Sequence, residues 1–385
     1  MQQSILLFCG QPVAATPIGQ RLGAFAAHLR RQGWTVCLAS VDPSFAGKAT
    51  VVRDTDRQQD VEILGPTHYR VLPDGQRVQF SPLAYLGECR RLTQRLRDRA
   101  RDLHADIVLL STSLPASLFA VARLPKRPHR LWMDVDDWSA GQFTARGGGQ
   151  LIGAVYERLE LWLPPRADGI TACSVELAGL YPGATLIPNF IRLADIPTAR
   201  RVPGRVAFAS SVTAYHGHEP FLRALARRQA DLAGLEIVIL GGGDALPACQ
   251  ALAREAGLDR VVKFAGALSR PSMLAALAEA EIGVLPLWDN RLNRARFPLK
   301  LLDYLGCGCA VAASSTGMAQ AVLRDGETGL LSPAGDMDCL VENVLRLTRD
   351  AALRERIATS GRRLVQEYDE PLVCSRWQAA LTEPR

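Results

Sequence analysis

Two series of short apolar runs, separated by helical patterns, constrain the fold of this chain more than any other feature. A strand followed by a helix and a second strand is a βαβ unit, and repeated units predict a parallel sheet covered by helices. In the first half, the expected strands are residues 5–9, 35–41, 107–111, 130–135, 169–173 and 185–189. In the second half, they are residues 205–209, 236–240, 261–264, 282–286, 309–314 and 327–331. The sequence therefore predicts two α/β domains that bind ligands at the carboxyl ends of their strands.

A linker is expected between these halves. Pro188, Pro197, the pair Arg200-Arg201 and Pro203 interrupt the alternation of strands and helices, and such composition is typical of a domain boundary. We expect an N-terminal Rossmann-like domain over residues 1–195 and a C-terminal one over residues 204–368. Residues 369–385 form a last helix, which contains Trp377 and is expected to cross back to the first domain. A length of 385 residues also exceeds what one ordinary core accommodates.

The composition indicates a globular, mildly basic protein. Hydrophobic residues make up 48% and the net charge is +6, which favours anionic ligands or an acidic membrane surface without demanding either. The nine cysteines are scattered, and the one close pair, Cys307 and Cys309, is not a zinc motif by itself. We expect a reducing, cytoplasmic compartment and no nucleic-acid partner. The start of the chain lacks a basic signal region, so any membrane contact is expected to be peripheral.

The most informative single stretch is residues 296–308. From Pro298 its pattern is helical, with a predicted buried stripe of Leu299, Leu302 and Leu305. Lys300, Asp303 and Tyr304 are spaced by three and four residues, so they are expected to share one exposed face. A cation and a carboxylate there suit a ligand with phosphate and sugar hydroxyls, and an ordinary surface ion pair is the alternative.

The first half carries two candidate positions at strand ends. Gly19, after the first strand, could let backbone N–H groups approach an anion, although no G-x-G-x-x-G fingerprint is present. Residues 134–138, after the fourth strand, contain Asp136 and Asp137. Three interpretations of these carboxylates stay open: contact with an acceptor or sugar, capping of the next helix, and metal binding.

Three further segments receive structural predictions. Residues 43–80 are expected to be irregular, and residues 139–150 a mobile loop. Residues 82–104 are predicted to form a basic amphipathic helix, whose arginine-rich side is assigned to solvent, with docking to anionic lipid as the alternative. Its predicted apolar stripe consists of Leu83, Leu86, Cys89, Leu92, Leu96, Ala100 and Leu103.

Several short motifs occur together in a fixed order. They are PIG at 17–19, VDD at 135–137, IPN at 187–189, VILGGG at 238–243, VKFAG at 262–266, IGVLPL at 282–287, PLKLLDYLGCG at 298–308 and DGETGLL at 325–331. On these motifs the chain resembles a GT-B glycosyltransferase of family four. The resemblance implies two Rossmann-like domains facing a central cleft. It also implies a retaining reaction that needs neither a metal nor a cofactor beyond a nucleoside-diphosphate sugar, with UDP- or GDP-sugars favoured.

The resemblance assigns roles to individual positions. Asp303 stands where the family has its second glutamate, which holds the donor ribose. The family's first glutamate falls on Ala295, and its arginine and lysine after the first strand of the second domain fall on Ser211 and His216. A leaving diphosphate needs positive charge or oriented donors, so other residues must supply them.

Replacement cations are available beside residues 298–308. Arg294, Arg296 and Lys300 could bind the diphosphate, because guanidinium groups match phosphate oxygens well. Of these, Arg296 and Lys300 are assigned to catalysis together with Asp136 and Asp137. The remaining donor contacts are assigned to Gly19, Gly241, Gly242, Ala265, Leu268, Thr316, Gly317 and Met318.

The expected function is transfer of a sugar to a hydroxyl acceptor, which is a saccharide, a lipid-linked molecule or a small molecule. Assembly of bacterial polysaccharide, glycolipid or glycoconjugate on the cytoplasmic face of the membrane is the expected setting. Two alternatives stay open. The chain could bind a nucleotide sugar or a partner without turnover, which the residues Ala295, Ser211 and His216 favour, or it could be a sugar-nucleotide epimerase.

Overall fold

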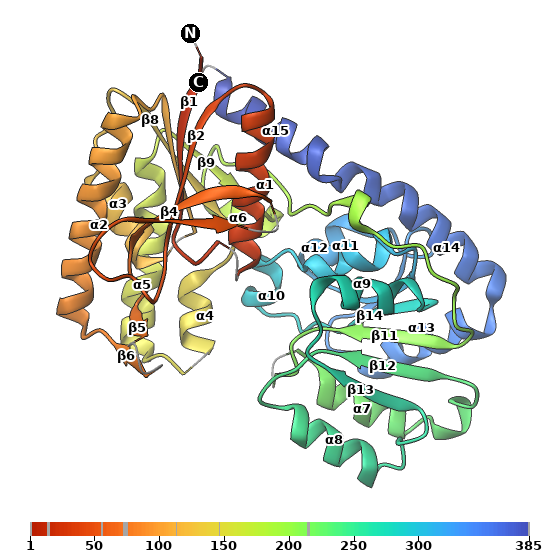
Figure 1. Cartoon of the computed structure of the whole chain (residues 1–385). Coiled ribbons are helices and arrows are strands. Elements are labelled where there is room, and N and C mark those ends of the chain that lie inside the picture. The colour runs from red at the N-terminus through yellow and green to blue at the C-terminus, as the bar shows by residue number, and fades with distance from the viewer. Residues whose placement is uncertain are drawn as a thin grey trace. The chain divides into compact units, whose positions relative to one another are not determined.

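The structure is a computed structural model that describes residues 2–13, 16–54, 57–71, 76–112, 114–145, 147–213 and 216–383. It divides into two compact units (Figure 1). The first unit comprises Met1–Pro188 and Val373–Arg385, and the second comprises Asn189–Leu372. The chain thus enters the second unit at Asn189, directly after Pro188, the first residue marked for the linker, although the first domain was expected to run to residue 195. It returns to the first unit at Val373.

The first unit is built on one sheet, in which the described residues form eight strands in the order β10-β9-β8-β7-β1-β2-β4-β3. Neighbouring strands are parallel except for β3 and β4, which are antiparallel. The strands of this sheet are β1 Ser4–Cys9, β2 Thr35–Val41, β3 Thr50–Asp54, β4 Gln59–Gly65, β7 Ile107–Ser111, β8 Arg130–Val135, β9 Gly169–Ala172 and β10 Thr185–Leu186. Strands β1 and β7 and most of β2 and β8 are buried. Their sequences are continuously apolar because helices cover both faces of the sheet.

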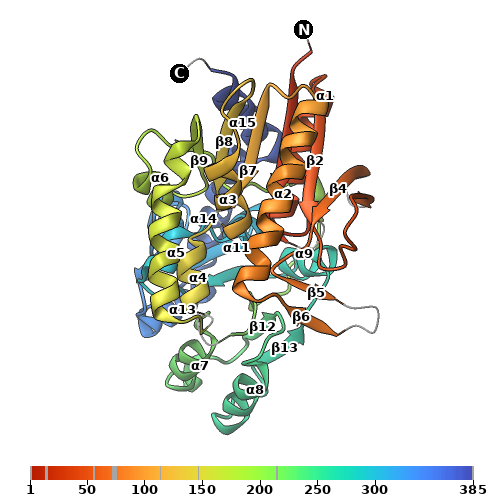
Figure 2. The same cartoon turned by 90° about the vertical axis from the view of Figure 1, so that its left-hand side faces the viewer.

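The helices of the first unit lie on the two faces of this sheet. One layer, seen from outside in Figure 2, contains α2 Pro82–Asp102, α3 Pro115–Arg123 and α5 Gln150–Trp162. The other face carries α1 Pro17–Arg31 and α15 Glu370–Thr382 (Figure 1). The remaining elements are α4 Ser139–Ala145, the 3₁₀ helix η1 Pro164–Arg166, α6 Val175–Leu180 and the hairpin strands β5 Tyr69–Val71 and β6 Arg77–Gln79.

Two sequence predictions in this unit are wrong. Residues 43–80 contain strands β3 to β6 rather than irregular chain. Because β3 and β6 are largely exposed, no buried apolar face marks them in the sequence. Residues 139–150 include helix α4 rather than a loop. The buried carboxylate of Glu160 in α5 accepts hydrogen bonds from the backbone N–H groups of Ser139 and Ala140, so this helix depends on a distant residue.

The second unit has a purely parallel sheet, whose described strands run in the order β13-β12-β11-β14-β15-β16. Its strands are β11 Arg205–Ala209, β12 Glu236–Leu240, β13 Val262–Gly266, β14 Ile282–Leu285, β15 Ala310–Ser315 and β16 Leu330–Pro333. Its helices are α7 His218–Ala226, α8 Leu246–Glu255, α9 Arg270–Ala278, α10 Arg291–Ala295, α11 Leu299–Gly306, α12 Gly317–Val322, α13 Met337–Arg349 and α14 Ala351–Leu364.

The core of the second unit forms where β11, β12 and β14 pack against α7 and α13. Phe208, Phe221 and Leu340 are among its fully buried members. No helix among the described residues of the whole chain is both long enough and apolar enough to cross a bilayer.

Candidate functional site

The topology of the second sheet determines where a ligand can bind. Successive strands run outward from β11 through β12 to β13 on one side, and from β14 through β15 to β16 on the other. The order therefore reverses between β11 and β14, and open α/β sheets bind ligands where the order reverses. The loops that follow these two strands meet there, since a Cβ on Gly217 would lie 3.2 Å from Cβ of Pro286.

Tyr304 of α11 joins the ends of these two strands. Its hydroxyl accepts a hydrogen bond from the Ala209 N–H at 2.7 Å and donates one to the Val284 carbonyl at 3.0 Å. Gly283 makes room for the ring, because a Cβ there would lie 2.5 Å from it. Tyr304 is fully buried, so its predicted position on an exposed face is wrong, and its role is to hold the two strand ends together.

Asp303 lies in a cluster of charges. Its side chain is 2% exposed and pairs with Lys300 Nζ at 3.1 Å and with an Arg270 nitrogen, also at 3.1 Å. Lys300 Nζ also lies 2.8 Å from Sδ of Met273. The predicted proximity of Lys300 and Asp303 is correct. The predicted exposure of Asp303 is wrong, because its side chain is buried.

Arg270 was missed by the sequence analysis. It is the first residue of α9, capped by Ser269, and it lies 33 positions before Asp303. Its side chain is 38% exposed, so it can meet a ligand while it contacts the buried carboxylate. The predicted apolar stripe of α11 is also incomplete: Leu302 and Leu305 are buried, but Leu299 is half-buried, and Leu301 is fully buried instead.

Arg296 lies near the loop that follows β11. Its Nε is buried and has no hydrogen-bond partner among the described residues, which is uncommon for a buried donor in a folded protein. Burial and, secondly, the positive charge of Arg296 lower the pKa of His216 to about 4. His216 is therefore neutral at pH 7, and its Nδ1 lies 2.7 Å from the Thr213 hydroxyl.

Ala295, which precedes Arg296, is 1% exposed at the end of α10. The position at which the resemblance expects a glutamate is therefore enclosed by protein. Arg294 pairs with Asp289 at 2.7 Å, and the Thr316 hydroxyl reaches the same Asp289 oxygen at 3.5 Å.

The structure places Thr316, Gly317 and Met318 at the start of α12. Gly317 has a φ of +50°, and a Cβ there would lie 2.8 Å from the Asn293 carbonyl oxygen. Only glycine fits such a position. Met318 is buried. Because Gly317 approaches Asn293 and Arg294 so closely, α12 packs against the segment that carries Arg294.

Gly241 and Gly242 follow β12. A Cβ on Gly241 would lie 1.9 Å from the Ser210 carbonyl oxygen, so glycine is needed for two backbone loops to approach each other. A Cβ on Gly242 would lie 3.2 Å from Ala267. Ala265 and Leu268, at and after the edge strand β13, are exposed.

In the first unit, Gly19 has a packing role. Its N–H donates to the capping hydroxyl of Thr16 at 3.1 Å, and a Cβ would lie 2.2 Å from the Val13 carbonyl oxygen. This N–H group therefore bonds to the helix cap, whereas the sequence suggested that it faces an anion.

The carboxylates after β8 have different environments. Asp134 is buried and pairs with Arg21 at 3.2 Å, while Asp137 accepts hydrogen bonds from the Trp138 N–H and the Gln142 amide near the start of α4. Asp136 lies between them, half-buried, and burial together with the charges of Asp137 and Asp134 raises its pKa well above the usual range. The described residues contain no group of three or more side chains able to hold a metal ion.

Comparisons with known proteins agree with this architecture. Residues 203–350 match the family described as Glycosyl transferases group 1. A phosphatidyl-myo-inositol mannosyltransferase of Mycobacterium leprae (strain TN) is 27% identical over 207 residues, which cover 52% of this chain and 54% of that protein. The chain thus spans about half the length of this relative.

Two solved structures share the fold over almost the whole chain. Sucrose-phosphate synthase from Thermosynechococcus elongatus has a TM-score of 0.77 at 15% identity and 98% coverage of both chains. The Anabaena protein Alr3699/HepE in complex with UDP-glucose has a TM-score of 0.74 at 16% identity, with coverage of 99% and 100%. The chain therefore has the GT-B fold, and residues 203–350 match the glycosyl transferases group 1 family.

Proposed function

We propose that the chain is a retaining, metal-independent glycosyltransferase of family four. It transfers a sugar from a nucleoside-diphosphate sugar to a hydroxyl on a saccharide or lipid-linked acceptor, in the assembly of bacterial polysaccharide or glycolipid. The observation that carries the proposal is the cluster of Asp303, Lys300 and Arg270, which joins a buried carboxylate to two partly exposed cations. The match to a glycosyltransferase family over residues 203–350 supports it.

On the donor side, we assign the diphosphate to Arg296, Lys300 and Arg270. Transfer leaves negative charge on the departing diphosphate, and cations fixed before the reaction stabilise that charge most effectively. The buried Nε of Arg296 has no partner among the described residues, and a phosphate oxygen is a group that would satisfy it. Asp303 is held by two cations, yet each carboxylate oxygen has a second lone pair that can accept a ribose hydroxyl.

We assign the remaining donor contacts to residues around the strand ends of the second unit. Arg294 and the start of α12, with Thr316, Gly317 and Met318, lie beside the segment that carries Arg296. Gly241, Gly242, Ala265 and Leu268 lie after or on neighbouring strands β12 and β13. A UDP-sugar is the favoured donor, because a protein of the same fold is known in complex with UDP-glucose.

On the acceptor side, we assign Asp136 and Asp137 to binding of the hydroxyl group. The raised pKa of Asp136 favours its neutral form, which can both donate and accept a hydrogen bond. Gly19 belongs to the helix that follows β1, at the position where the strand order of the first sheet reverses.

A second candidate function is binding of a nucleotide sugar without turnover. Ala295 is buried where the family has a glutamate, and His216 is neutral where the family has a lysine. This candidate predicts nucleotide binding in the absence of transfer to any acceptor.

Calorimetric titration with UDP, GDP, ADP and dTDP tests the donor site. Wild-type protein should bind one nucleotide with a dissociation constant on the order of micromolar, and the double variant Arg296→Ala/Lys300→Ala should lose at least about 100-fold in affinity. Arg227→Ala is the matched control, because Arg227 pairs with Asp338 on the exposed surface. Absence of binding by all four nucleotides, or equal affinity in the double variant, would contradict the assignment. Incubating wild type with the sugar form of the preferred nucleotide and simple sugar acceptors then separates transfer from binding alone.

A further inference from the structure

Helix α5 of the first unit exposes an apolar face. Leu151 is 81% exposed and Trp162 is 61% exposed. Both lie on a face with Ile152, Val155 and Leu159, all of which are exposed. This face continues along the whole helix, and contiguous exposed apolar surface of this kind marks an interaction site.

Polar contacts fix this unusual orientation of α5. The buried residues of this helix are Gly153 and Glu160, whereas an ordinary amphipathic helix buries its apolar side chains. The Glu160 carboxylate accepts hydrogen bonds from the N–H groups of Ser139 and Ala140, and the Tyr181 hydroxyl donates to the Glu160 carbonyl at 3.0 Å. The apolar face therefore points outward because the opposite side is bonded to the protein.

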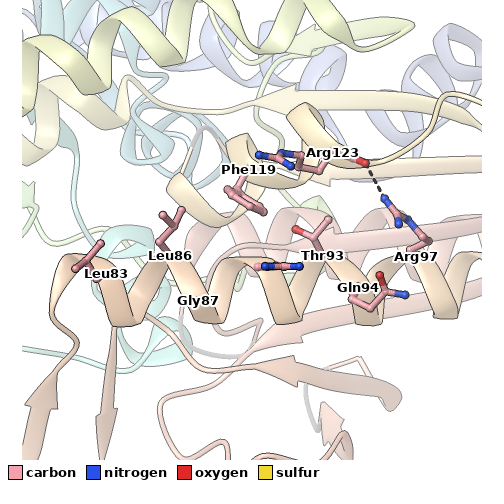
Figure 3. A pocket seen from close by; sticks show the side chains of 9 residues that line it. Leu83, Leu86, Gly87, Thr93, Gln94, Arg97, Phe119 and Arg123 are labelled. Carbon is pink, nitrogen blue, oxygen red and sulfur yellow. Dashed lines mark hydrogen bonds between the residues drawn. The ribbon is translucent and has the colours of Figure 1, made fainter.

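Residues of α2 and α3 line a groove, and both helices belong to the same layer as α5 (Figure 2). The volume of the groove is about 600 Å³. Figure 3 shows its apolar side chains Leu83 and Leu86 toward the start of α2, and Phe119 beside Arg123. The arginines of the groove are Arg90, Arg97 and Arg123.

The start of α2 also extends the exposed apolar surface. Leu83 and Leu86 are 83% and 51% exposed, so the sequence prediction that both belong to the buried stripe of α2 is wrong. The start of α2 lies near α5, since burial, Glu160 and, more weakly, Tyr85 of α2 raise the pKa of Tyr156 in α5.

Several arginines on or next to this layer lack a carboxylate partner among the described residues. Within the part of the chain that the structure describes, Arg90, Arg123, Arg158 and Arg166 form no salt bridge. Arg166 instead lies over the ring of Trp162, 5.0 Å from its centroid. The surface therefore combines exposed apolar side chains with cations that lack carboxylate partners.

We propose that this layer of α2, α3 and α5 docks on an anionic lipid bilayer. The apolar face of α5 enters the boundary between headgroups and acyl chains, and the groove arginines bind lipid phosphates. Trp and Arg are the side chains favoured at that depth. A second copy of the chain fits less well, because pairing this face with itself would bring its uncompensated arginines together. The proposal concerns residues outside those assigned to sugar transfer, so docking does not depend on that reaction.

Co-sedimentation with vesicles tests the proposal. Wild-type protein should bind equimolar phosphatidylcholine and phosphatidylglycerol vesicles at least about tenfold more tightly than pure phosphatidylcholine vesicles. Leu151→Ser/Trp162→Ser should weaken binding to the anionic vesicles at least about tenfold, and so should Arg90→Gln/Arg123→Gln. The matched control is Val51→Ser/Val52→Ser, because these valines are exposed on edge strand β3 of the same unit and should leave binding unchanged.

Three outcomes would overturn docking: no binding of wild type to anionic vesicles, equal binding by the layer variants, and equal losses in the control. Sedimentation velocity without vesicles tests whether a second copy of the chain occupies this face. A wild-type dimer that the Leu151→Ser/Trp162→Ser variant dissociates would assign the face to that second copy. Thermal unfolding of each variant verifies its fold. Nucleotide titration of the same preparations separates a failure of docking from a failure of the proposed donor site.

Discussion

The carboxylate of Asp303 is held between two cations of different origin. Lys300 lies one helical turn before it, and Arg270 belongs to another helix. We expect Asp303→Asn to lower the free energy of unfolding by about 1–3 kcal/mol, because the neutral amide leaves both cations without their counter-charge. Chemical denaturation measures this change. Asp338→Asn is the control, since its pair with Arg227 is exposed and its loss should cost less than about 1 kcal/mol.

The comparison of these residues shows what spacing can predict. Lys300 and Asp303 share a helix, so their spacing predicted the contact that the structure shows. Arg270 contacts Asp303 only because α9 packs against α11, and nothing near Arg270 in the sequence signals this. Burial of Asp303 is likewise a tertiary property, which helix periodicity in residues 296–308 did not reveal.

His218 gives a prediction for pH dependence. It is 1% exposed and its ring stacks on Phe208 at 4.1 Å, and burial and then His216 lower its pKa to about 4. In the unfolded chain His218 takes up a proton near pH 6.5, whereas in the folded chain it does so only near pH 4. The contribution of His218 to stability is therefore complete above pH 6.5 and falls as the pH is lowered toward 4.

We expect this histidine to account for up to about 3 kcal/mol of the stability lost between pH 7.5 and pH 4. Urea denaturation across this range, on wild type and on His218→Phe, measures it. His129 and His216 also have lowered pKa values and are expected to keep part of the dependence in the variant. An identical pH profile in wild type and variant would contradict the assignment.

At the scale of elements, the hydroxyl of Tyr304 connects β11 to β14 where the strand order reverses. Tyr304→Phe keeps the buried ring but leaves the Ala209 N–H and the Val284 carbonyl without this partner. We expect a loss of about 1–3 kcal/mol in the free energy of unfolding, because a buried donor without a partner costs its full desolvation energy. A change below about 0.5 kcal/mol in chemical denaturation would show that other groups satisfy these atoms.

Elements with strong periodicity were predictable, and those set by tertiary contacts were not. The central strands of both sheets are continuous apolar runs, and Ser81 caps the helix predicted over residues 82–104. Helix α4 was missed because Glu160, twenty residues away, caps it. The stripe of α2 was predicted correctly from Cys89 to Ala100, but its first turns carry Leu83 and Leu86 away from the core.

At the scale of the whole molecule, the alternation of strands and helices in the sequence predicted the two sheets. The structure adds the residues through which the last helix contacts the first unit. Trp377 of α15 is fully buried, stacks on Phe25 of α1 at 4.2 Å and lies beneath Arg21 at 4.4 Å. Arg21 in turn holds Asp134 and the carbonyl groups of Ile187 and Pro188. A residue near the end of the sequence thus stabilises the unit formed by its beginning.

We expect Trp377→Ala to lower the free energy of unfolding by about 3–5 kcal/mol, because it leaves a large cavity between α1 and α15. Trp162→Ala is the matched control, since that ring is mostly exposed and its loss should change stability by less than about 0.5 kcal/mol. Calorimetric unfolding compares the two. Equal effects of both substitutions would show that α15 adds little to the first unit.

The division of the first unit between residues 1–188 and 373–385 sets an order of events during synthesis. A ribosome delivers all of the second unit before it delivers Val373, so the second unit has its complete sequence while the first still lacks α15. The apolar side of α1 therefore stays uncovered while the intervening 184 residues, Asn189–Leu372, are translated. A ribosome-bound chain whose emerged part ends before Trp377 should therefore be bound by chaperones that recognise exposed apolar segments, and one whose emerged part includes Thr382 should be released.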